Sequence, residues 1–342
     1  MKSKHDKSKS SKIDGKIVVI TGGTGSLGQA LTKRLLKTGV QTIRIFSRNE
    51  NKQVTMSESI EDKDQRLRFF IGDVRDRHRL EHALEGADIV FHAAALKHVP
   101  VIEYNPFEAI KTNVIGSQNV IDACLHQNVE IAVGVGTDKS VSPLSTYGAT
   151  KLLMEKLFVT ANNYLNPKEH KTKFLALRYG NVLGSSGSVI PKFIDMIKQN
   201  KKLTVTDLNM TRFSLTIDEA LDFIIDSTFS GKGSEIFIPK LKAYTIKELK
   251  DALFELLEDT GYKKIPVRQG EKFHEILINH DEMRNTWENK SKYIILNPLS
   301  SNFEKVKSNY TKINSQKPYS SEIVKKLSIK ELKDIIESSN LL

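Results

Sequence analysis

Short apolar runs alternate with longer amphipathic stretches through the first half of this chain. Residues 16–21, 42–46, 67–71, 88–91, 130–135 and 174–178 are rich in Ile, Val, Leu and Phe, as buried parallel strands are. Stretches with helical spacing lie between them; the first, residues 26–38, is expected to end at a Gly39 C-cap. Strict strand–helix alternation predicts an α/β protein with a doubly wound, parallel Rossmann sheet.

The alternation becomes less regular after residue 180. Residues 191–200, 217–229 and 245–258 have helical spacing, with short strands near 203–206 and 235–238. Thr245 with Glu248, and Ser328 with Glu331, match the capping box, so helices are expected to begin there. We divide the chain into a tail (1–13), a sheet domain (14–180), a smaller α/β lobe from which some chain returns to the sheet (181–300), and a C-terminal loop and helix (301–342).

A glycine-rich loop follows the first strand directly and opens the first helix. Its glycines are Gly22, Gly25 and Gly28, spaced G-x-x-G-x-x-G. Glycines permit the tight turn and the close approach of backbone N–H groups to a pyrophosphate, and the helix N-terminus adds partial positive charge. We therefore expect the first strand–helix junction to bind a dinucleotide, through Gly22, Thr24, Gly25, Ser26, Leu27 and Gly28.

The ends of the next strands predict how the rest of the cofactor is held. After the second strand, Ser47, Arg48 and Lys52 offer donors to a ribose 2′-phosphate; an acidic residue, which Glu50 could supply, would favour the 2′-hydroxyl of NAD. NADP is thus preferred over NAD. Adenine is expected beside Asp73 and Val74, where Asp73 can accept from its amine while Asp76 caps a helix. Small residues Ala93, Ala94 and Ala95 let the backbone lie along the cofactor, and His92 is expected to be a packed histidine.

Candidate chemistry follows the fifth strand. Tyr147 and Lys151 are spaced Y-x-x-x-K, which places them one turn apart on one helix face. An ammonium beside a phenol lowers the pKa of the phenol, which can then take a proton from a hydroxyl group. Thr137, Asp138 and Lys139 lie directly after the strand. In a buried site a carboxylic acid can keep its proton and a lysine can lose one.

These motifs together resemble the extended short-chain dehydrogenase/reductase family of nucleotide-sugar enzymes, and within it the UDP-N-acetylglucosamine 4,6-dehydratase branch. The resemblance covers residues 14–300. It rests on residues 72–76 (GDVRD), 93–100 (AAALKHVP), 137–139 (TDK), 147–151 (YGATK), 178–182 (RYGNV), 187–191 (GSVIP), 210–213 (MTRF) and 270–275 (GEKFHE).

The resemblance implies an internal redox cycle that regenerates the cofactor. Tyr147 takes the proton of the C4 hydroxyl while C4 is oxidised, and Lys151 also holds the nicotinamide ribose. Lys139 removes the C5 proton, Asp138 protonates the departing C6 hydroxyl, and C5 is reprotonated from the opposite face. Cofactor contacts by Lys97 and Asn113 are also implied, although Asn113 can equally brace a helix. Substrate contacts are implied for Lys97, Asn181, Ser188, Val189, Pro191, Thr204, Val205, Arg212, Arg268 and Glu271.

Some positions depart from the family pattern. Ser186 stands where relatives commonly carry Arg, Gly136 replaces a usual Ser, and Leu27 replaces Phe. Two alternatives therefore stay open: an NAD(P)-dependent nucleotide-sugar 4-epimerase or reductase, and a dehydratase acting on UDP-glucose. A cofactor-binding sensor without catalysis is disfavoured, because it need not keep Asp138, Lys139, Tyr147 and Lys151.

Composition limits the remaining function classes. The chain has 342 residues and a net charge of +11, but residues 1–12 alone hold five lysines and one aspartate, as a solvated tail does. We see no zinc-ligand spacing, no basic helix with interleaved aromatics, no apolar run that spans a bilayer and no secretory signal. We expect no metal, nucleic-acid or membrane partner. With a single cysteine, Cys124, the chain is placed in the cytoplasm, and the resemblance implies a homo-oligomer, a dimer or hexamer.

Overall fold

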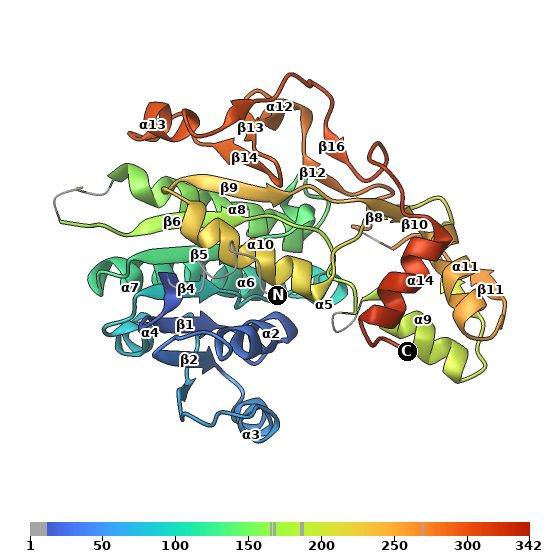
Figure 1. Ribbon diagram of the computed structural model, residues 1–342, viewed down its shortest axis with the longest axis horizontal. Helices are drawn as coiled ribbons and strands as arrows, with labels where there is room; N and C mark the ends of the chain where they lie inside the picture. Colours follow the sequence, from blue (N-terminus) through green and yellow to red (C-terminus); the bar gives the residue numbers. More distant parts are fainter. Residues whose placement is uncertain (1–11, 165, 167–168, 185–187, 269) are drawn as a thin grey trace.

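One large sheet organises the molecule (Figure 1). The computed structural model describes residues 12–164, 166, 169–184, 188–268 and 270–342. The sheet has ten strands in the order β15-β13-β14-β9-β6-β5-β4-β1-β2-β3. These strands are β1 (Ile17–Thr21), β2 (Thr42–Ser47), β3 (Leu67–Ile71), β4 (Ile89–His92), β5 (Ile131–Val135), β6 (Lys173–Leu177), β9 (Glu235–Pro239), β13 (Thr286–Glu288), β14 (Lys292–Leu296) and β15 (Thr311–Lys312).

The six strands predicted in the first half of the sequence, together with β9, form the parallel part of this sheet. β1 pairs in parallel with β2 on one side and with β4 on the other. This reversal of strand order is a topological switch point, and α/β sheets bind ligands at the carboxyl ends of the strands beside it. The predicted Rossmann sheet is confirmed, and β14, β13 and β15 extend it with antiparallel pairs.

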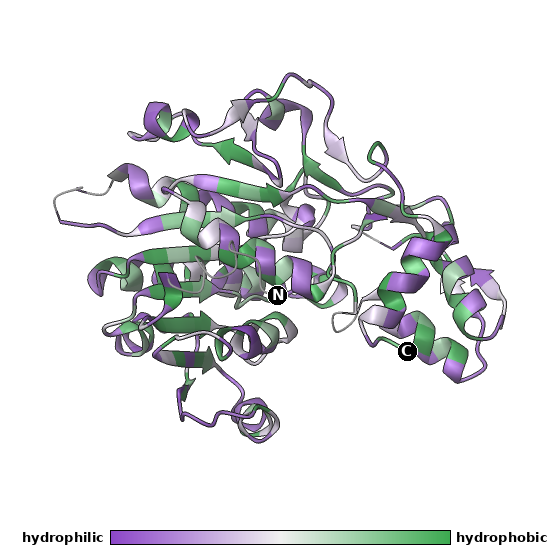
Figure 2. Ribbon diagram, in the orientation of Figure 1, coloured by the Kyte–Doolittle hydropathy of each residue, from purple (hydrophilic) through white to green (hydrophobic). Residues whose placement is uncertain are grey.

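Helices cover both faces of the parallel strands. Val18 and Ile20 of β1 belong to the core under α2 and α10, whereas Val19 belongs to the core under α4, α7 and α8. Hydrophobic residues accordingly fill the central strands in Figure 2. The helices of this part are α2 (Ser26–Leu35), α3 (Glu50–Ser59), α4 (Arg77–Leu84), α5 (Val99–Tyr104), α6 (Pro106–Ala109), α7 (Gly116–His126), α8 (Thr146–Ala161) and α10 (Ile217–Ser230), with a π-helical turn η1 (Ile110–Ile115) and 3₁₀ turns η2 (Asp138–Ser140) and η3 (Asn162–Tyr164).

A smaller lobe lies at one end of the sheet, where Figure 1 shows α9, α11 and α14 grouped around the C-terminus. Its core includes Leu203, Leu249 and Leu332. Helices α11 and α14 begin with the capping boxes predicted at Thr245 and Ser328. The remaining elements are α9 (Val189–Lys198), β7 (Leu203–Val205), β8 (Thr211–Phe213), β10 (Ala243–Thr245), α11 (Ile246–Leu256), β11 (Tyr262–Lys264), β12 (Ile276–Ile278), α12 (His280–Met283), α13 (Phe303–Lys307), β16 (Tyr319–Ser320) and α14 (Ile329–Ser338).

Two local predictions are wrong. Helix α2 ends at Leu35, and Gly39 is not its C-cap, because Lys37 and Thr38 donate to carbonyls three residues back and tighten the chain into a turn. The N–H of Gly39 instead donates to Asp14 Oδ1 at 2.9 Å. The stretch 300–320, read as loop, contains α13 and two short strands, of which β15 extends the large sheet. Two-residue strands carry no readable periodicity, so only their partners create them.

Several expectations fall on residues 1–11 and 185–187, which lie outside the described residues. They concern most of the basic tail and the departure at Ser186. Ile13, which the sequence places in the tail, is buried in the core beneath α2. None of the helices in the described part of the chain combines the length and apolar character needed to cross a lipid bilayer.

Candidate active site

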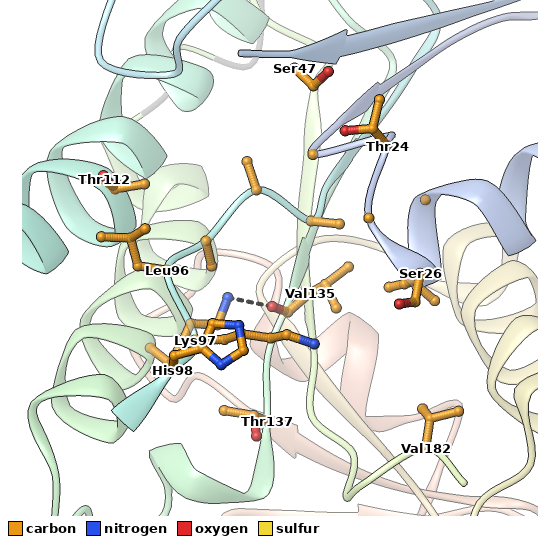
Figure 3. A pocket seen from close by; sticks show the side chains of 18 of the residues that line it. Thr24, Ser26, Ser47, Leu96, Lys97, His98, Thr112, Val135, Thr137 and Val182 are labelled. Carbon is orange, nitrogen blue, oxygen red and sulfur yellow. Dashed lines mark hydrogen bonds between the residues drawn. The ribbon is translucent and has the colours of Figure 1, made fainter. Parts of the chain in front are cut away.

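A cleft of about 960 Å³ opens at the carboxyl ends of β1, β2, β4 and β5 (Figure 3). Glycine-loop residues line one wall, Ser47 lies toward one end and Thr137 toward the other. Sixteen of the predicted cofactor residues line the cleft, and Asp73 and Asn113 lie outside that lining. The sixteen are Gly22, Thr24, Gly25, Ser26, Leu27, Gly28, Ser47, Arg48, Lys52, Val74, Ala93, Ala94, Ala95, Lys97, Tyr147 and Lys151.

The glycine loop has the shape that a dinucleotide needs. Gly22 has a φ of +70°, and a Cβ there would lie 2.7 Å from Ala94 Cα, so the loop rests directly on the alanine segment. A Cβ on Gly28 would lie 2.4 Å from the carbonyl oxygen of Gly23. Helix α2 starts at Ser26 after the N-cap residue Gly25, which makes no side-chain cap, so the partial positive charge of the helix N-terminus lies beside the cleft. These residues fit a pyrophosphate.

The end of the cleft where Ser47 lies carries positively charged side chains, Arg48 and Lys52. Arg48 is half exposed, and its Nη1 lies 3.7 Å from Asp73 Oδ2. Asp73 is bound more closely by Arg75, whose Nη2 lies 2.7 Å from the same oxygen. Burial opposes ionisation of Asp73, but the hydrogen bonds and charge of Arg75, with the charge of Arg48, lower its pKa. Helix α4 is capped by Asp76, as predicted, and Asp73 contacts both arginines; the predicted contact of Asp73 with adenine stays a prediction.

Asn113 and His92 support the cleft from behind. The amide of Asn113 donates to Leu96 O and Thr150 Oγ1, both at 3.0 Å, and accepts from Leu96 N at 2.8 Å. It therefore braces the loop that carries Lys97 against α8. His92 contacts Thr21 Oγ1 and Ser117 Oγ, and burial lowers its pKa to about 3. The prediction of a packed, hydrogen-bonded His92 is confirmed.

The turn η2 presents the residues that follow β5. The Thr137 side chain caps this turn, and its hydroxyl donates to Asp138 Oδ1 at 2.9 Å. The N–H of Asp138 donates to Tyr179 O at 3.0 Å, which ties the turn to the end of β6. Ser140 Oγ lies 2.6 Å from both Thr137 O and Glu155 Oε1. A short turn thus acquires a defined geometry from contacts with two strands and a helix.

Tyr147 and Lys151 lie one turn apart on α8, as predicted, and both line the cleft. The Lys151 ammonium donates to Val135 O at 2.6 Å, the bond drawn at Val135 in Figure 3. Burial lowers the pKa of Lys151 to about 8. The Thr137 side chain lies near the Tyr147 hydroxyl and favours its ionised form. The sequence predicted that Lys151 lowers the pKa of Tyr147, but burial raises this pKa instead. The charge that opposes the increase is that of Lys139.

Asp138, which is buried, and Lys139, which is partly exposed, form an acid–base pair. Lys139 Nζ lies 3.0 Å from Asp138 Oδ1 and donates to Asn181 Oδ1 at 3.0 Å. Asp138 is fully buried, and its Oδ2 has no hydrogen-bond partner. Burial lowers the pKa of Lys139, but the charge of Asp138, together with that of Glu275 when it is ionised, outweighs burial and raises it. The pair is therefore ionic here, and transfer of one proton along the 3.0 Å contact would give a neutral acid beside a neutral amine.

Apart from Lys97, which lines the cleft, the substrate residues implied by the resemblance lie in the second lobe or on the chain leading to it. Asn181 follows β6 and meets Lys139, and Arg212 Nη2 on β8 lies 3.2 Å from Glu271 Oε1. Ser188 is the N-cap residue of α9, and its buried Oγ has no partner. Val189 and Pro191 belong to the first turn of that helix, Thr204 and Val205 to β7, and Arg268 to the loop before Glu271. The cleft lining does not include these residues.

Sequence reasoning missed two contributions to this region. Glu275 is buried beside Lys139, with Oε1 3.7 Å from Lys139 Nζ. It lies in the same short segment as Glu271, and this proximity in the sequence could have indicated that Glu275 also belongs to the site. Ser339 and Leu341, at the end of the chain, line the cleft. Leu341 takes the space next to Gly184, where a Cβ would lie 2.2 Å from its Cδ2. Nothing in the polar C-terminal sequence predicts that contact.

Fold and site together define an extended short-chain dehydrogenase/reductase, with a dinucleotide cradle and a Tyr–Lys pair on the helix after β5. Among the described residues, no cluster of three His, Cys, Asp or Glu side chains has the arrangement of a metal site. The chain belongs to the polysaccharide biosynthesis protein family, whose model matches residues 18–297.

Known relatives extend over nearly the whole chain. A UDP-N-acetylglucosamine 4,6-dehydratase (inverting) of Campylobacter jejuni is 43% identical over 340 residues, covering 94% of this chain and 98% of the relative. A UDP-glucose 4-epimerase of Rickettsia conorii is 39% identical and covers 94% and 95%, respectively. The X-ray structure of Pen from Bacillus thuringiensis, 37% identical, superposes with a TM-score of 0.89 and covers 96% and 99%.

Proposed function

We propose that this protein is an NADP-dependent UDP-N-acetylglucosamine 4,6-dehydratase that inverts C5 and yields a UDP-2-acetamido-2,6-dideoxy-hexos-4-ulose. The observation that carries the proposal is the Asp138–Lys139 pair, 3.0 Å apart, beside Tyr147. An epimerase or simple reductase needs only the tyrosine and its lysine, whereas removal of water needs an additional base and acid. The similarity to the Campylobacter dehydratase supports the same hydro-lyase reaction.

Residues of α8 carry out the first half of the reaction, the oxidation at C4. A bound nicotinamide would accept a hydride from C4 of the sugar and return it to C6. Tyr147, as a phenolate, takes the proton of the C4 hydroxyl and becomes a neutral phenol. Lys151 is held against Val135 O and positions the cofactor ribose. The charge of Lys139 favours the phenolate that this step requires.

Residues of turn η2 carry out the loss of water. Movement of a proton from Lys139 Nζ to Asp138 Oδ1 breaks an N–H bond, forms an O–H bond and leaves each group in its active form. The neutral Lys139 amine then takes the C5 proton, which the 4-keto group acidifies, and Asp138 protonates the C6 hydroxyl as it departs. Asn181 holds the Lys139 side chain from the other side.

We assign NADP rather than NAD to the cationic end of the cleft. Ser47, Arg48 and Lys52 all line it, and Arg48 projects with about half of its side chain exposed. A guanidinium of this kind binds a phosphate through parallel hydrogen bonds. Asp73 sits 3.7 Å from Arg48 and orders it without covering it.

The uridine diphosphate is assigned to the second lobe. The unpartnered Ser188 Oγ at the start of α9, with its first turn of Val189 and Pro191, suits a phosphate oxygen. Arg212, Arg268 and Glu271 then contact phosphate and ribose, and the strand of Thr204 and Val205 lies against uracil. Lys97, on the cleft wall, reaches toward both cofactor and sugar.

We expect a homo-oligomer, a dimer or hexamer. Exposed apolar side chains gather on α5, α6, η1 and α8, which are consecutive or contacting elements. They are Val101, Tyr104, Phe107, Ile115 and Leu153. An apolar surface of this size on one side of a chain is typical of an interface between subunits.

Proton NMR of the purified protein with UDP-N-acetylglucosamine in D₂O tests the function. We expect a new C6 methyl signal with deuterium at C5, and ring couplings that report inversion. Retention of the C5 configuration would reject the inversion but leave the dehydratase function in place. Turnover of UDP-glucose in place of the N-acetyl sugar would show that the substrate is UDP-glucose.

A second candidate is a nucleotide-sugar 4-epimerase, which the similarity to the Rickettsia enzymes favours. In the same NMR experiment an epimerase would produce a C4 epimer that keeps its C6 hydroxyl. That outcome would reduce Asp138 and Lys139 to structural residues.

A further inference from the structure

A second buried carboxyl group faces the Asp138–Lys139 pair. Glu275 directly precedes β12 and is only 3% exposed. Its Oε1 lies 3.7 Å from Lys139 Nζ and 3.8 Å from Arg212 Nε, which are distances of charge attraction rather than of hydrogen bonding. Its Oε2 is buried without any hydrogen-bond partner. A carboxylate buried in this way would leave a charged oxygen without a donor, and this costs more free energy than leaving the uncharged hydroxyl of a carboxylic acid without a partner.

The surroundings of Glu275 include charges of both signs. The groups that face it are Asp138 and Lys139 of η2, Arg212 of β8, Tyr244 of β10 and Lys272 of its own segment. Burial and the negative charge of Asp138 raise the pKa of Glu275, and the three cations oppose this increase without cancelling it. The ammonium of Lys272 is engaged with Val141 O, so it does not pair with Glu275. Two carboxyl groups that share one site rarely ionise together.

We propose that Glu275 is a positioning residue that remains a neutral carboxylic acid during turnover and thereby allows Lys139 to give up its proton. The inference rests on the proposed dehydratase function, in which Lys139 must act as a neutral base. The step moves one proton from Lys139 Nζ to Asp138 Oδ1, across 3.0 Å. An ionised Glu275 would add a second counter-ion to the ammonium and oppose this transfer, whereas a protonated Glu275 leaves Asp138 as the only close counter-ion.

The pH profile of Glu275→Gln tests this inference, because glutamine keeps the neutral shape and cannot ionise. In the wild type, ionisation of Glu275 at high pH restores the ammonium of Lys139, so kcat falls on the alkaline side. We expect the alkaline limb of kcat to move upward by at least one pH unit in Glu275→Gln, with KM within about twofold. Glu322→Gln is the matched control, because Glu322 is exposed beside His274. The alkaline limb of kcat in this variant should coincide with that of the wild type.

Two results would overturn the inference. The first is an alkaline limb of kcat in Glu275→Gln that coincides with the wild-type limb. The second is a loss of kcat by more than a hundredfold while cofactor binding stays intact, because this would mean that the carboxylate itself is required. A second measurement does not depend on turnover or on folding of the variant. In wild-type protein carrying ¹³C-labelled glutamate, the Glu275 carboxyl resonance should report a protonated group at pH 7, and an ionised one would refute the proposal. Absence of a 4-keto product in the wild type would reject the dehydratase function, and this NMR titration would then decide the state of Glu275.

Discussion

Arg178 and Glu155 form an ion pair from which water is fully excluded: Arg178 Nη2 lies 2.7 Å from Glu155 Oε2, and neither side chain is exposed. Arg178 also binds Glu282 at 2.9 Å. Glu155 contacts Ser140 of turn η2 at 2.6 Å, so the pair connects the end of β6 through α8 to Asp138 and Lys139. The pair also explains a departure from the family pattern, because a Cβ on Gly136 would lie 2.7 Å from Glu155 Oε1.

Replacement of Arg178 by Met should destabilise the protein by about 3–5 kcal/mol, because it leaves buried Glu155 and partly buried Glu282 without their partner. Urea unfolding at pH 7 measures the change. Arg284→Met is the matched control: Arg284 is exposed and pairs with exposed Asp281, so its loss should cost less than about 0.5 kcal/mol. Equal effects of the two substitutions would show that the buried pair does not stabilise the fold.

Replacement of Lys139 by Met should lower kcat for the 4-keto-6-deoxy product by roughly 10²–10⁴-fold, the usual contribution of a general base. Cofactor affinity should change little, because Lys139 is not part of the cleft lining. Product formation is followed by the C6 methyl signal, and cofactor binding by fluorescence titration. Lys263→Met, on the exposed strand β11, serves as control. A normal rate in Lys139→Met would disprove the assigned base.

Replacement of Arg48 by Ala should weaken NADP binding roughly tenfold to a hundredfold, which corresponds to one or two charge-assisted hydrogen bonds. NAD affinity should stay within about threefold, because NAD has no 2′-phosphate for Arg48 to bind. Calorimetric titration with each cofactor makes the comparison within one variant. If Arg48→Ala weakens both cofactors equally, or neither, the assignment of the 2′-phosphate to this end of the cleft fails.

Acid should destabilise the fold through His92, whose pKa is lowered by burial to about 3 from 6.5. The unfolded chain binds a proton at higher pH than the folded one does, so this contribution is complete above pH 6.5 and is lost as pH falls toward 3. Replacement by Asn removes the titration. The stability difference between wild type and His92→Asn should therefore shrink by about 2 kcal/mol between pH 7 and pH 5. A difference independent of pH would exclude His92 as the source.

Local patterns were sufficient to predict the parallel part of the sheet and the cofactor end of the site. Strands such as β1 are buried on both faces, so their apolar runs are continuous and easy to read. The glycine loop is recognisable because Gly22 needs a positive φ and a close approach to Ala94 that no other residue allows. The Tyr147–Lys151 spacing follows from the geometry of one helix.

The rest of the site depends on contacts between distant parts of the chain. The amino-acid sequence alone determined the Rossmann sheet, the dinucleotide loop and the identity of the residues available for chemistry, because these follow from short-range periodicity and steric limits. Only the tertiary structure decided that Glu275 faces Lys139, that Leu341 closes against Gly184, and that Lys139 rather than Lys151 is the cation that opposes the increase in the pKa of Tyr147. Burial and the distances between charges set those relationships, and both exist only once separate segments of the chain have packed together.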